Sequence, residues 1–156
     1  MARIKKVNIR KAVAEDLNEL LYFADRSNDE SSYNVKFSAK ASRAFFKTHL
    51  DHPVAEIVVA EYEGSIVGGV MMAYSLEFHE QPFCYVNKFW VSPMARGSDA
   101  GRRLLQAVLM WAKQNNCSHV FTTATAGLDE KNQQLFINLM KKGGMKEDGP
   151  VLFVSI

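Results

Sequence analysis

The sequence predicts a mixed α/β fold, in which a mainly antiparallel central sheet of six to seven strands carries helices on both faces. Residues 56–91 contain strand-like runs rich in β-branched and aromatic side chains, whereas residues 99–115 and 128–142 repeat apolar residues at helical spacing. Another strand is expected at 120–125, directly after the helix at 99–115. Strand, helix and strand in this order predict a parallel crossover. The full element order expected is β-α-α-β-β-β-α-β-α-β.

The first fifty residues are expected to form one strand and two helices. A strand begins within residues 4–9, and leucines at helical spacing follow in residues 17–24. The polar stretch 26–37 contains several Ser, Asn and Asp residues, which favour a loop. A second helix, with Phe45-Phe46 on its apolar side, is expected to end before Pro53, because proline cannot continue a helix.

The middle and the end of the chain contain two turn signals. The strand-like runs 57–62 and 66–74 flank Glu63-Gly64-Ser65, so they are expected to pair as an antiparallel hairpin. Gly143-Gly144 is expected to end the last helix, because glycine readily adopts the left-handed conformation found past a helix end. The apolar run 151–154 then predicts a closing strand.

Length and composition limit the class of protein. The 156 residues, of which 47% are hydrophobic and 23% charged, are expected to form one domain spanning residues 1–156 with a full core. The net charge of +2 and the scattered Lys and Arg residues argue against a nucleic-acid partner. No signal peptide and no run of about eighteen apolar residues is present, so a cytoplasmic protein without a membrane partner is expected. Cys84 and Cys117 lack metal-ligand spacing and are expected to be buried free thiols.

The segment from 85 to 105 predicts an anion-binding site. A strand ends in Val91-Ser92-Pro93, and a loop with Arg96 and Gly101 then leads into an amphipathic helix. Such a layout directs backbone N–H groups and the positive end of a helix dipole to one place. An ordinary strand-to-helix turn, with Ser98 or Asp99 as N-cap, accounts for the same residues without a ligand.

The Arg-x-x-x-x-Gly spacing resembles the acetyl-CoA pyrophosphate loop of the Gcn5-related N-acetyltransferases, the GNAT family, and the expected element order is that family's order. The resemblance implies the acyl-CoA N-acyltransferase fold and an enzyme that transfers the acetyl group of its cosubstrate, acetyl-CoA, to an amine by direct attack, without a metal. The backbone of the fourth strand would bind the pantetheine arm, the loop would bind the pyrophosphate, and an Asn of the last helix would contact both. In this sequence those positions are Phe89, Trp90 and Val91, then Arg96, Gly97, Ser98, Asp99, Ala100, Gly101 and Arg102, and finally Asn132.

Two departures from the family's pattern bear directly on cosubstrate binding and catalysis. Asp99 stands where the first glycine of the loop belongs, and its carboxylate would compete for the N–H donors and repel a diphosphate. At ~5 Å and an effective dielectric of about 20, each pair of unit charges costs roughly 3 kcal/mol, although a turn toward Arg102 or Arg103 reduces this. Leu139 stands where the family places a tyrosine that acts as acid. The alternative function is therefore a catalytically degenerate protein of this fold, with weakened or lost acetyl-CoA binding, that acts through a protein partner.

The catalytic candidates lie on the expected fourth strand. Family members often use a Glu there as general base, and this chain has Tyr85 and Asn87 instead. Tyr85 can relay a proton through water, and Asn87 can orient a water molecule. Packing or pairing with a neighbour within the strand is the alternative explanation for both residues.

The acceptor is expected to approach from the 26–37 loop and the connection before residue 83. Acidic residues in and near these segments favour a cationic amine or peptide, and a solvated acidic loop is the alternative explanation. Small amines, amino-acid derivatives, antibiotics, protein N-termini and lysines all remain candidates. Family members often dimerise, and the terminal strand 151–156 offers a surface for a homodimer. The acidic residues are Asp25, Asp29, Glu30, Glu77 and Glu80.

Overall fold

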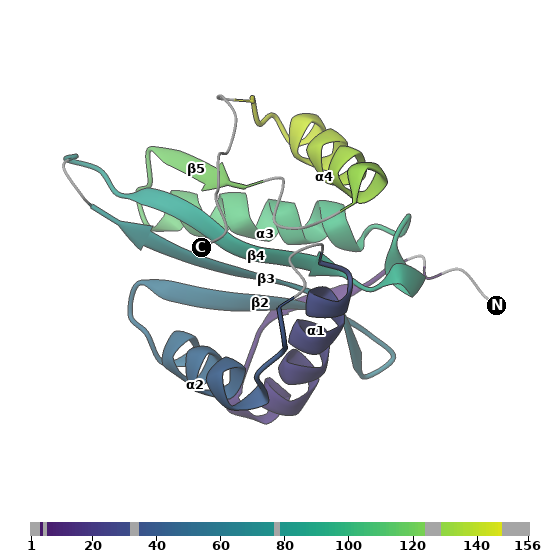
Figure 1. Cartoon of the computed structure of the whole chain (residues 1–156). Coiled ribbons are helices and arrows are strands. Elements are labelled where there is room, and N and C mark those ends of the chain that lie inside the picture. The colour runs from purple at the N-terminus through teal and green to yellow at the C-terminus, as the bar shows by residue number, and fades with distance from the viewer. Residues whose placement is uncertain (1–3, 5, 32–34, 77–78, 124–128, 148–156) are drawn as a thin grey trace.

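A five-stranded sheet forms the middle layer of the computed structural model, which describes residues 4, 6–31, 35–76, 79–123 and 129–147 (Figure 1). The strands lie in the order β1-β2-β3-β4-β5, and the first four pair antiparallel. β5 runs parallel to β4, as the crossover through the intervening helix predicts. The strands are β1 (Asn8–Lys11), β2 (Ala55–Tyr62), β3 (Ser65–Ser75), β4 (Phe83–Val91) and β5 (His119–Thr122).

Helices cover both faces of this sheet. Figure 1 shows α1 and α2 on one face and α3 on the other, with α4 beside α3. A 3-10 turn, Ala14–Asp16, precedes α1, and a second one, Pro93–Ala95, follows β4. None of the helices in the described part of the chain combines the length and hydropathy that a bilayer crossing requires. The helices are α1 (Leu17–Asp29), α2 (Ala39–Leu50), α3 (Ala100–Gln114) and α4 (Glu130–Lys142).

Each face of the sheet has its own hydrophobic core. Leu104, Val108 and Trp111 of α3 pack against one face, where Val70 and Met72 of β3 are also buried. On the other face, residues of α1 and α2 pack against Ile57 and Val59, which alternate along β2 as the period of two in a strand requires, and against Ile66 and Met71 of β3. This second core contains Leu17, Leu20, Leu21, Phe46, Ile57, Val59, Ile66 and Met71.

The hairpin and the end of the last helix confirm two turn predictions. Glu63 and Gly64 have positive φ angles of 50° and 79°, and Tyr62 faces Ser65 across the turn. Two consecutive positive φ angles are what a tight turn between right-twisted strands needs. At the end of α4, Gly144 has φ 92°, and the Met145 N–H bonds to the Met140 carbonyl at 3.1 Å.

Two expectations about the elements are corrected. The sheet has five strands in the described residues rather than six to seven, and the expected closing strand at 151–154 lies outside those residues. The expected loop at 26–37 is also too long, because α1 continues to Asp29. Within that last turn the Arg26 guanidinium lies 5.4 Å from the Tyr22 ring centroid and 3.6 Å from the Asp29 carboxylate. These contacts at helical spacing stabilise a polar turn that composition alone assigns to a loop.

Candidate active site

The candidate site begins where β4 and β5 stop pairing. Their parallel register ends at Val86 and Thr122, whereas β4 continues to Val91. Just past this point Asn87 forms a β-bulge, because Met71 faces Lys88 and the next residue of β3 already faces Val86. The edge of β4 turned away from β3 therefore has no strand partner from Phe89 to Val91 in the described residues. On this edge the Val91 carbonyl accepts from the Arg96 side chain. Backbone groups without a strand partner can bind an extended ligand as an added strand does.

The start of α3 leaves several backbone donors open. The Ala100 N–H bonds to the Ser98 hydroxyl at 3.1 Å, but the N–H groups of Asp99, Gly101 and Arg102 have no acceptor in the part of the chain that the structure describes. Gly97 has φ 84°, a left-handed conformation that favours glycine. Open N–H groups and the helix dipole together suit an anion, which is compatible with the predicted diphosphate site.

Asp99 does not cap these donors. Its Oδ1 accepts a hydrogen bond from the Val7 backbone N–H at 3.2 Å, and its Oδ2 lies 4.0 Å from Arg102 Nη2. The side chain of Arg103 donates to the carbonyl of the same Val7. The carboxylate is thus turned toward the segment that precedes β1, which leaves only a screened electrostatic cost for a bound diphosphate.

Arg96 connects the loop, α1 and α4. Its Nη2 lies 2.5 Å from Glu30 Oε2, its Nη1 lies 3.4 Å from Asn132 Oδ1, and its Nε donates to the Val91 carbonyl at 3.1 Å. Asp129 caps α4 by accepting from the Asn132 N–H at 2.9 Å and from its amide at 2.7 Å. The same hydrogen bonds, led by the one from the backbone, hold the pKa of Asp129 below its usual range. The structure thus brings together Arg96 and Asn132, two residues predicted to bind the cosubstrate.

Gly101 and Leu139 pack against each other where α3 meets α4. A Cβ atom at position 101 would lie 2.9 Å from Leu139 Cδ2. Gly101 therefore permits a close approach of the two helices. Leu139, which the sequence resemblance aligned with the family's tyrosine acid, is thus an aliphatic packing residue in this structure.

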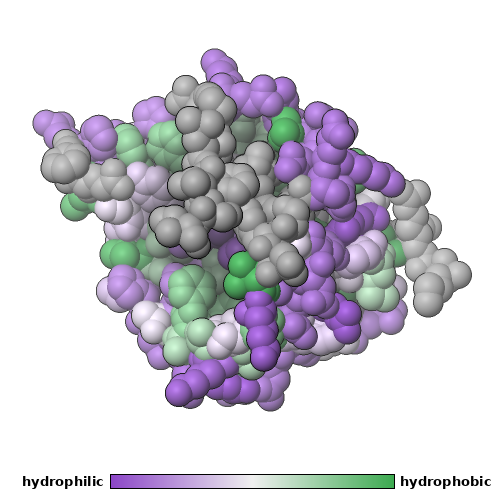
Figure 2. Space-filling model, viewed as in Figure 1, coloured by the Kyte–Doolittle hydropathy of each residue, from purple (hydrophilic) through white to green (hydrophobic). Residues whose placement is uncertain are grey.

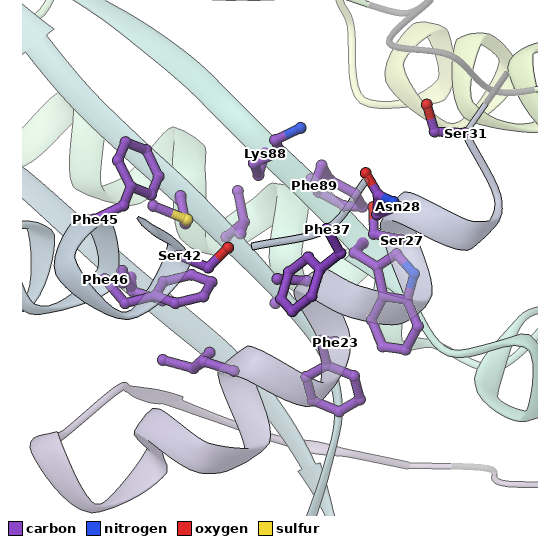
Figure 3. A pocket seen from close by; sticks show the side chains of 17 residues that line it. Phe23, Ser27, Asn28, Ser31, Phe37, Ser42, Phe45, Phe46, Lys88 and Phe89 are labelled. Atoms are coloured by element: carbon purple, nitrogen blue, oxygen red, sulfur yellow. The ribbon is translucent and has the colours of Figure 1, made fainter. Parts of the chain in front are cut away.

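A cavity of about 270 Å³ lies between α1, α2 and the strands β2, β3 and β4 (Figure 3). In Figure 2, hydrophobic residues gather between α2 and the sheet, with hydrophilic residues around them. Phe89 and Trp90 of the unpaired β4 edge line this cavity together with aromatic residues of the helices. The principal lining side chains are Phe23, Ser27, Asn28, Phe37, Ser42, Phe45, Phe46, Lys88, Phe89 and Trp90.

The sequence did not predict this cavity, because both phenylalanines of α2 were expected in the core. Phe46 is buried, but Phe45 is 44% exposed and lines the cavity. Adjacent residues on a helix point about 100° apart, so the pair could have indicated that one of them faces away from the core. Of the acidic residues expected around the acceptor, Glu77 lies outside the described residues, and Asp25, Asp29, Glu30 and Glu80 do not line the cavity.

The two catalytic candidates lie near the point where β4 and β5 separate. Tyr85 is in the paired part of β4 and stacks on Phe121 of β5 with ring centroids 5.8 Å apart. Asn87 is the exposed residue of the bulge, directly before Lys88 of the cavity wall. Neither Tyr85 nor Asn87 lines the cavity itself.

Comparison with known proteins decides the family. The model of the acetyltransferase (GNAT) family matches residues 15–138. The chain belongs to the GNAT family. Members of this family use acetyl-CoA as cosubstrate, and the chain is accordingly an acetyltransferase. The predicted family, fold class, enzyme class and cosubstrate are thereby confirmed.

Individual relatives match the chain at low identity. The uncharacterized N-acetyltransferase YhfO of Bacillus subtilis (strain 168) is 26% identical over 143 residues, which are 91% of each chain. The crystal structure of a predicted acetyltransferase with acetyl-CoA from Clostridium acetobutylicum matches with a TM-score of 0.77 at 18% identity, covering 96% of both chains. The aminoglycoside acetyltransferase meta-AAC0020 from an uncultured soil metagenomic sample, in complex with sisomicin, matches with a TM-score of 0.71 at 16% identity and the same coverage of both chains.

Proposed function

We propose that this acetyltransferase binds acetyl-CoA along the unpaired edge of β4 and transfers the acetyl group to an amine held in the aromatic cavity. One observation carries the proposal: Phe89 and Trp90 belong both to the unpaired edge of β4 and to the wall of the cavity. A thioester held on that edge would therefore lie beside an amine in the cavity. The amine can then attack the thioester carbonyl directly, without a covalent enzyme intermediate.

The described residues fit the cosubstrate. Backbone groups of Phe89 to Val91 would bind its pantetheine arm, and the open N–H groups at the start of α3 would bind its diphosphate, with Arg96 and Asn132 at the side. Acetyl-CoA supplies the activated acyl group. The alternative of a degenerate binding protein is not favoured, because Asp99 leaves the helix donors open.

Residues near the β4 bulge would transfer the proton of the amine. Amide formation requires that the attacking amine lose a proton, and Asn87 at the bulge would hold a water molecule that accepts it. Tyr85, two residues earlier on β4, would relay the proton onward. Leu139 cannot donate a proton, but a thiolate is stable enough to take one from solvent. Turnover is therefore expected without the family's tyrosine.

The test is calorimetric titration of the native chain with acetyl-CoA, followed by assay of thiol release with amines. We expect a dissociation constant in the micromolar range for the native chain, because its diphosphate donors are open. Arg96→Ala should weaken binding by about tenfold, whereas Lys113→Ala at the other end of α3 should not change it. No heat from the native chain, with binding restored by Asp99→Gly, would instead favour the degenerate binding protein.

A further inference from the structure

The wall of the aromatic cavity is unsuited to an acceptor with several positive charges. Aromatic and aliphatic residues make up most of the lining, and the serine and asparagine side chains in it are uncharged. Among the lining residues that the structure describes there is no carboxylate. A second ammonium group on the acceptor would lose water of hydration there without gaining a counter-charge.

Lys88 gives the wall a positive charge instead. It follows the bulge of β4, lines the cavity, and in the view of Figure 3 stands between Phe45 and Phe89. It forms no ion pair with any other described residue. An ammonium group at this position attracts a carboxylate of the acceptor and repels an additional amine.

Trp90 contributes apolar surface to the wall, and its ring lies 4.4 Å from the ring of Phe23, measured between centroids. Its indole N–H is buried and has no hydrogen-bond acceptor within the described residues, so it is not accessible to a ligand in the cavity. Among the lining residues, Lys88 is therefore the one whose charge favours a ligand with a carboxylate.

The volume of the cavity limits the size of the acceptor. Pockets for drug-sized ligands measure about 300–1,000 Å³. At about 270 Å³, this cavity lies just below that range. A compound with one ring fits such a volume, whereas a compound with three sugar rings would extend out of the cavity.

We infer, building on the proposed acetyl transfer, that the acceptor is a compact amine with an apolar, aromatic-sized body and a carboxylate, as in an aromatic α-amino acid. The body would pack among the phenylalanines, the carboxylate would pair with Lys88, and the amino group would lie beside Phe89 and Trp90. In the reaction the nitrogen forms a bond to the acetyl carbon and the thioester C–S bond breaks. The amine loses one proton and the released thiolate takes one up, so that the products are an N-acetyl compound and CoA.

A matched pair of acceptors tests this inference. L-Phenylalanine and phenethylamine share the aromatic body and differ by the carboxylate, and spermidine represents a polycation. We expect kcat/KM for L-phenylalanine to exceed that for phenethylamine by about tenfold and that for spermidine by more. Spermidine as the best acceptor, or equal use of the matched pair, would overturn the inference.

Variants of Lys88 test whether this residue causes the preference for L-phenylalanine over phenethylamine. Lys88→Gln should reduce the ratio of L-phenylalanine to phenethylamine to about twofold or less, mainly through KM, and Lys88→Arg should keep most of it. Phe45→Ala should raise KM for both compounds alike, because it removes apolar contact and no charge. An unchanged ratio in Lys88→Gln would contradict the assigned role of this residue.

Binding measured without turnover separates this inference from the proposed function. Calorimetry with L-phenylalanine, with and without saturating CoA, reports on the cavity directly. If L-phenylalanine binds in a Lys88-dependent manner and acetyl-CoA does not bind, the ligand class is supported and the proposed function fails. If acetyl-CoA binds and L-phenylalanine does not bind under either condition, the inference is overturned and acetyl-CoA binding stands.

Discussion

Asp99 and Glu30 place two negative charges around the proposed diphosphate site, and hydrogen bonds determine what each does there. Asp99 accepts from the Val7 N–H, and Glu30 pairs with Arg96, the cation expected to face the diphosphate. The two carboxylates thus have different effects on the proposed diphosphate site. Asp99 anchors the segment before β1, whereas Glu30 competes for Arg96.

Removing the charge of Glu30 should strengthen binding of the cosubstrate. Glu30→Gln is expected to improve the affinity for acetyl-CoA by about threefold, because an ion pair with partial solvent exposure contributes up to about 1 kcal/mol. Calorimetric titration measures the change. Asp29→Asn is the matched control, since Asp29 pairs with Arg26 and not with Arg96. Weaker binding in Glu30→Gln would show that Glu30 instead orients Arg96 for the cosubstrate.

Two substitutions at Asp99 should separate its charge from its hydrogen bond. Asp99→Asn keeps an oxygen for the Val7 N–H and is expected to improve acetyl-CoA affinity by up to about fivefold with little change in stability. Asp99→Ala loses the bond and should lower the free energy of unfolding by about 1 kcal/mol. Denaturant unfolding and calorimetry measure the two effects. Equal stability of both variants would argue against the contact with Val7.

At the scale of elements, the spacing between β3 and β4 supports the edge that would bind the cosubstrate. A Cβ atom at Gly68 would lie 3.0 Å from the Trp90 carbonyl oxygen and 3.3 Å from Leu104 Cδ1. The first of these neighbours is backbone, which cannot move as a side chain does. Glycine at position 68 therefore keeps β4 close to β3 just where its other edge is open.

Gly68→Ala is expected to destabilise the protein by about 1–3 kcal/mol, the usual cost of overpacking, and to weaken acetyl-CoA binding by displacing the β4 edge. Gly69→Ala is the control, because its Cβ would meet the nearest atom, the Val58 carbonyl oxygen, at an ordinary 3.4 Å. Thermal unfolding and calorimetry of both variants measure the difference. A Gly68→Ala protein as stable as Gly69→Ala would contradict this account of the strand spacing.

At the scale of the whole molecule, Arg10 joins three separate elements. Its guanidinium lies 2.7 Å from Asp16 before α1 and 2.8 Å from Glu61 of β2. Asp16 is buried, and its Oδ2 also accepts from the Val13 N–H at 2.8 Å. The hydrogen bond from Arg10 holds the pKa of Asp16 below its usual range, against the effect of burial, and the Val13 N–H adds to it.

This ion pair should make stability depend on pH in the acid range. Because the folded pKa of Asp16 is depressed, its contribution is complete above the unfolded value of about 3.9 and is lost as the pH falls through the folded pKa. At pH 7, Asp16→Asn should lower the free energy of unfolding by about 2 kcal/mol, and the difference from the native chain should shrink below about pH 4. Urea unfolding across this range measures it, with the exposed neighbour Glu15→Gln as control. A difference that is independent of pH would contradict the assigned role of the charge.

Local patterns in the sequence determined much of the architecture. The turn at Glu63-Gly64, the alternation in the strands, and the Arg96-to-Gly101 spacing each depend on residues close together in the chain, and they predicted the hairpin, the element order and the family. The end of α1 was the exception, because polar residues in its last turn make helical contacts that composition does not show. The residues that would bind acetyl-CoA along β4 and at the start of α3 remain predictions, which the open backbone groups support.

The sequence by itself thus predicted the fold class from its local periodicity, and the resemblance of its loop and element order to the GNAT family implied the family and the kind of cosubstrate. Only the tertiary structure decided where the charges act. Asp99 meets Val7 across 92 positions of sequence, and Arg96 meets Glu30 across 66. The aromatic cavity likewise combines residues of two helices and three strands. Contacts between residues so far apart in the sequence depend on how the helices and strands pack. A local sequence pattern therefore does not predict which way a carboxylate points or which side chains line a cavity.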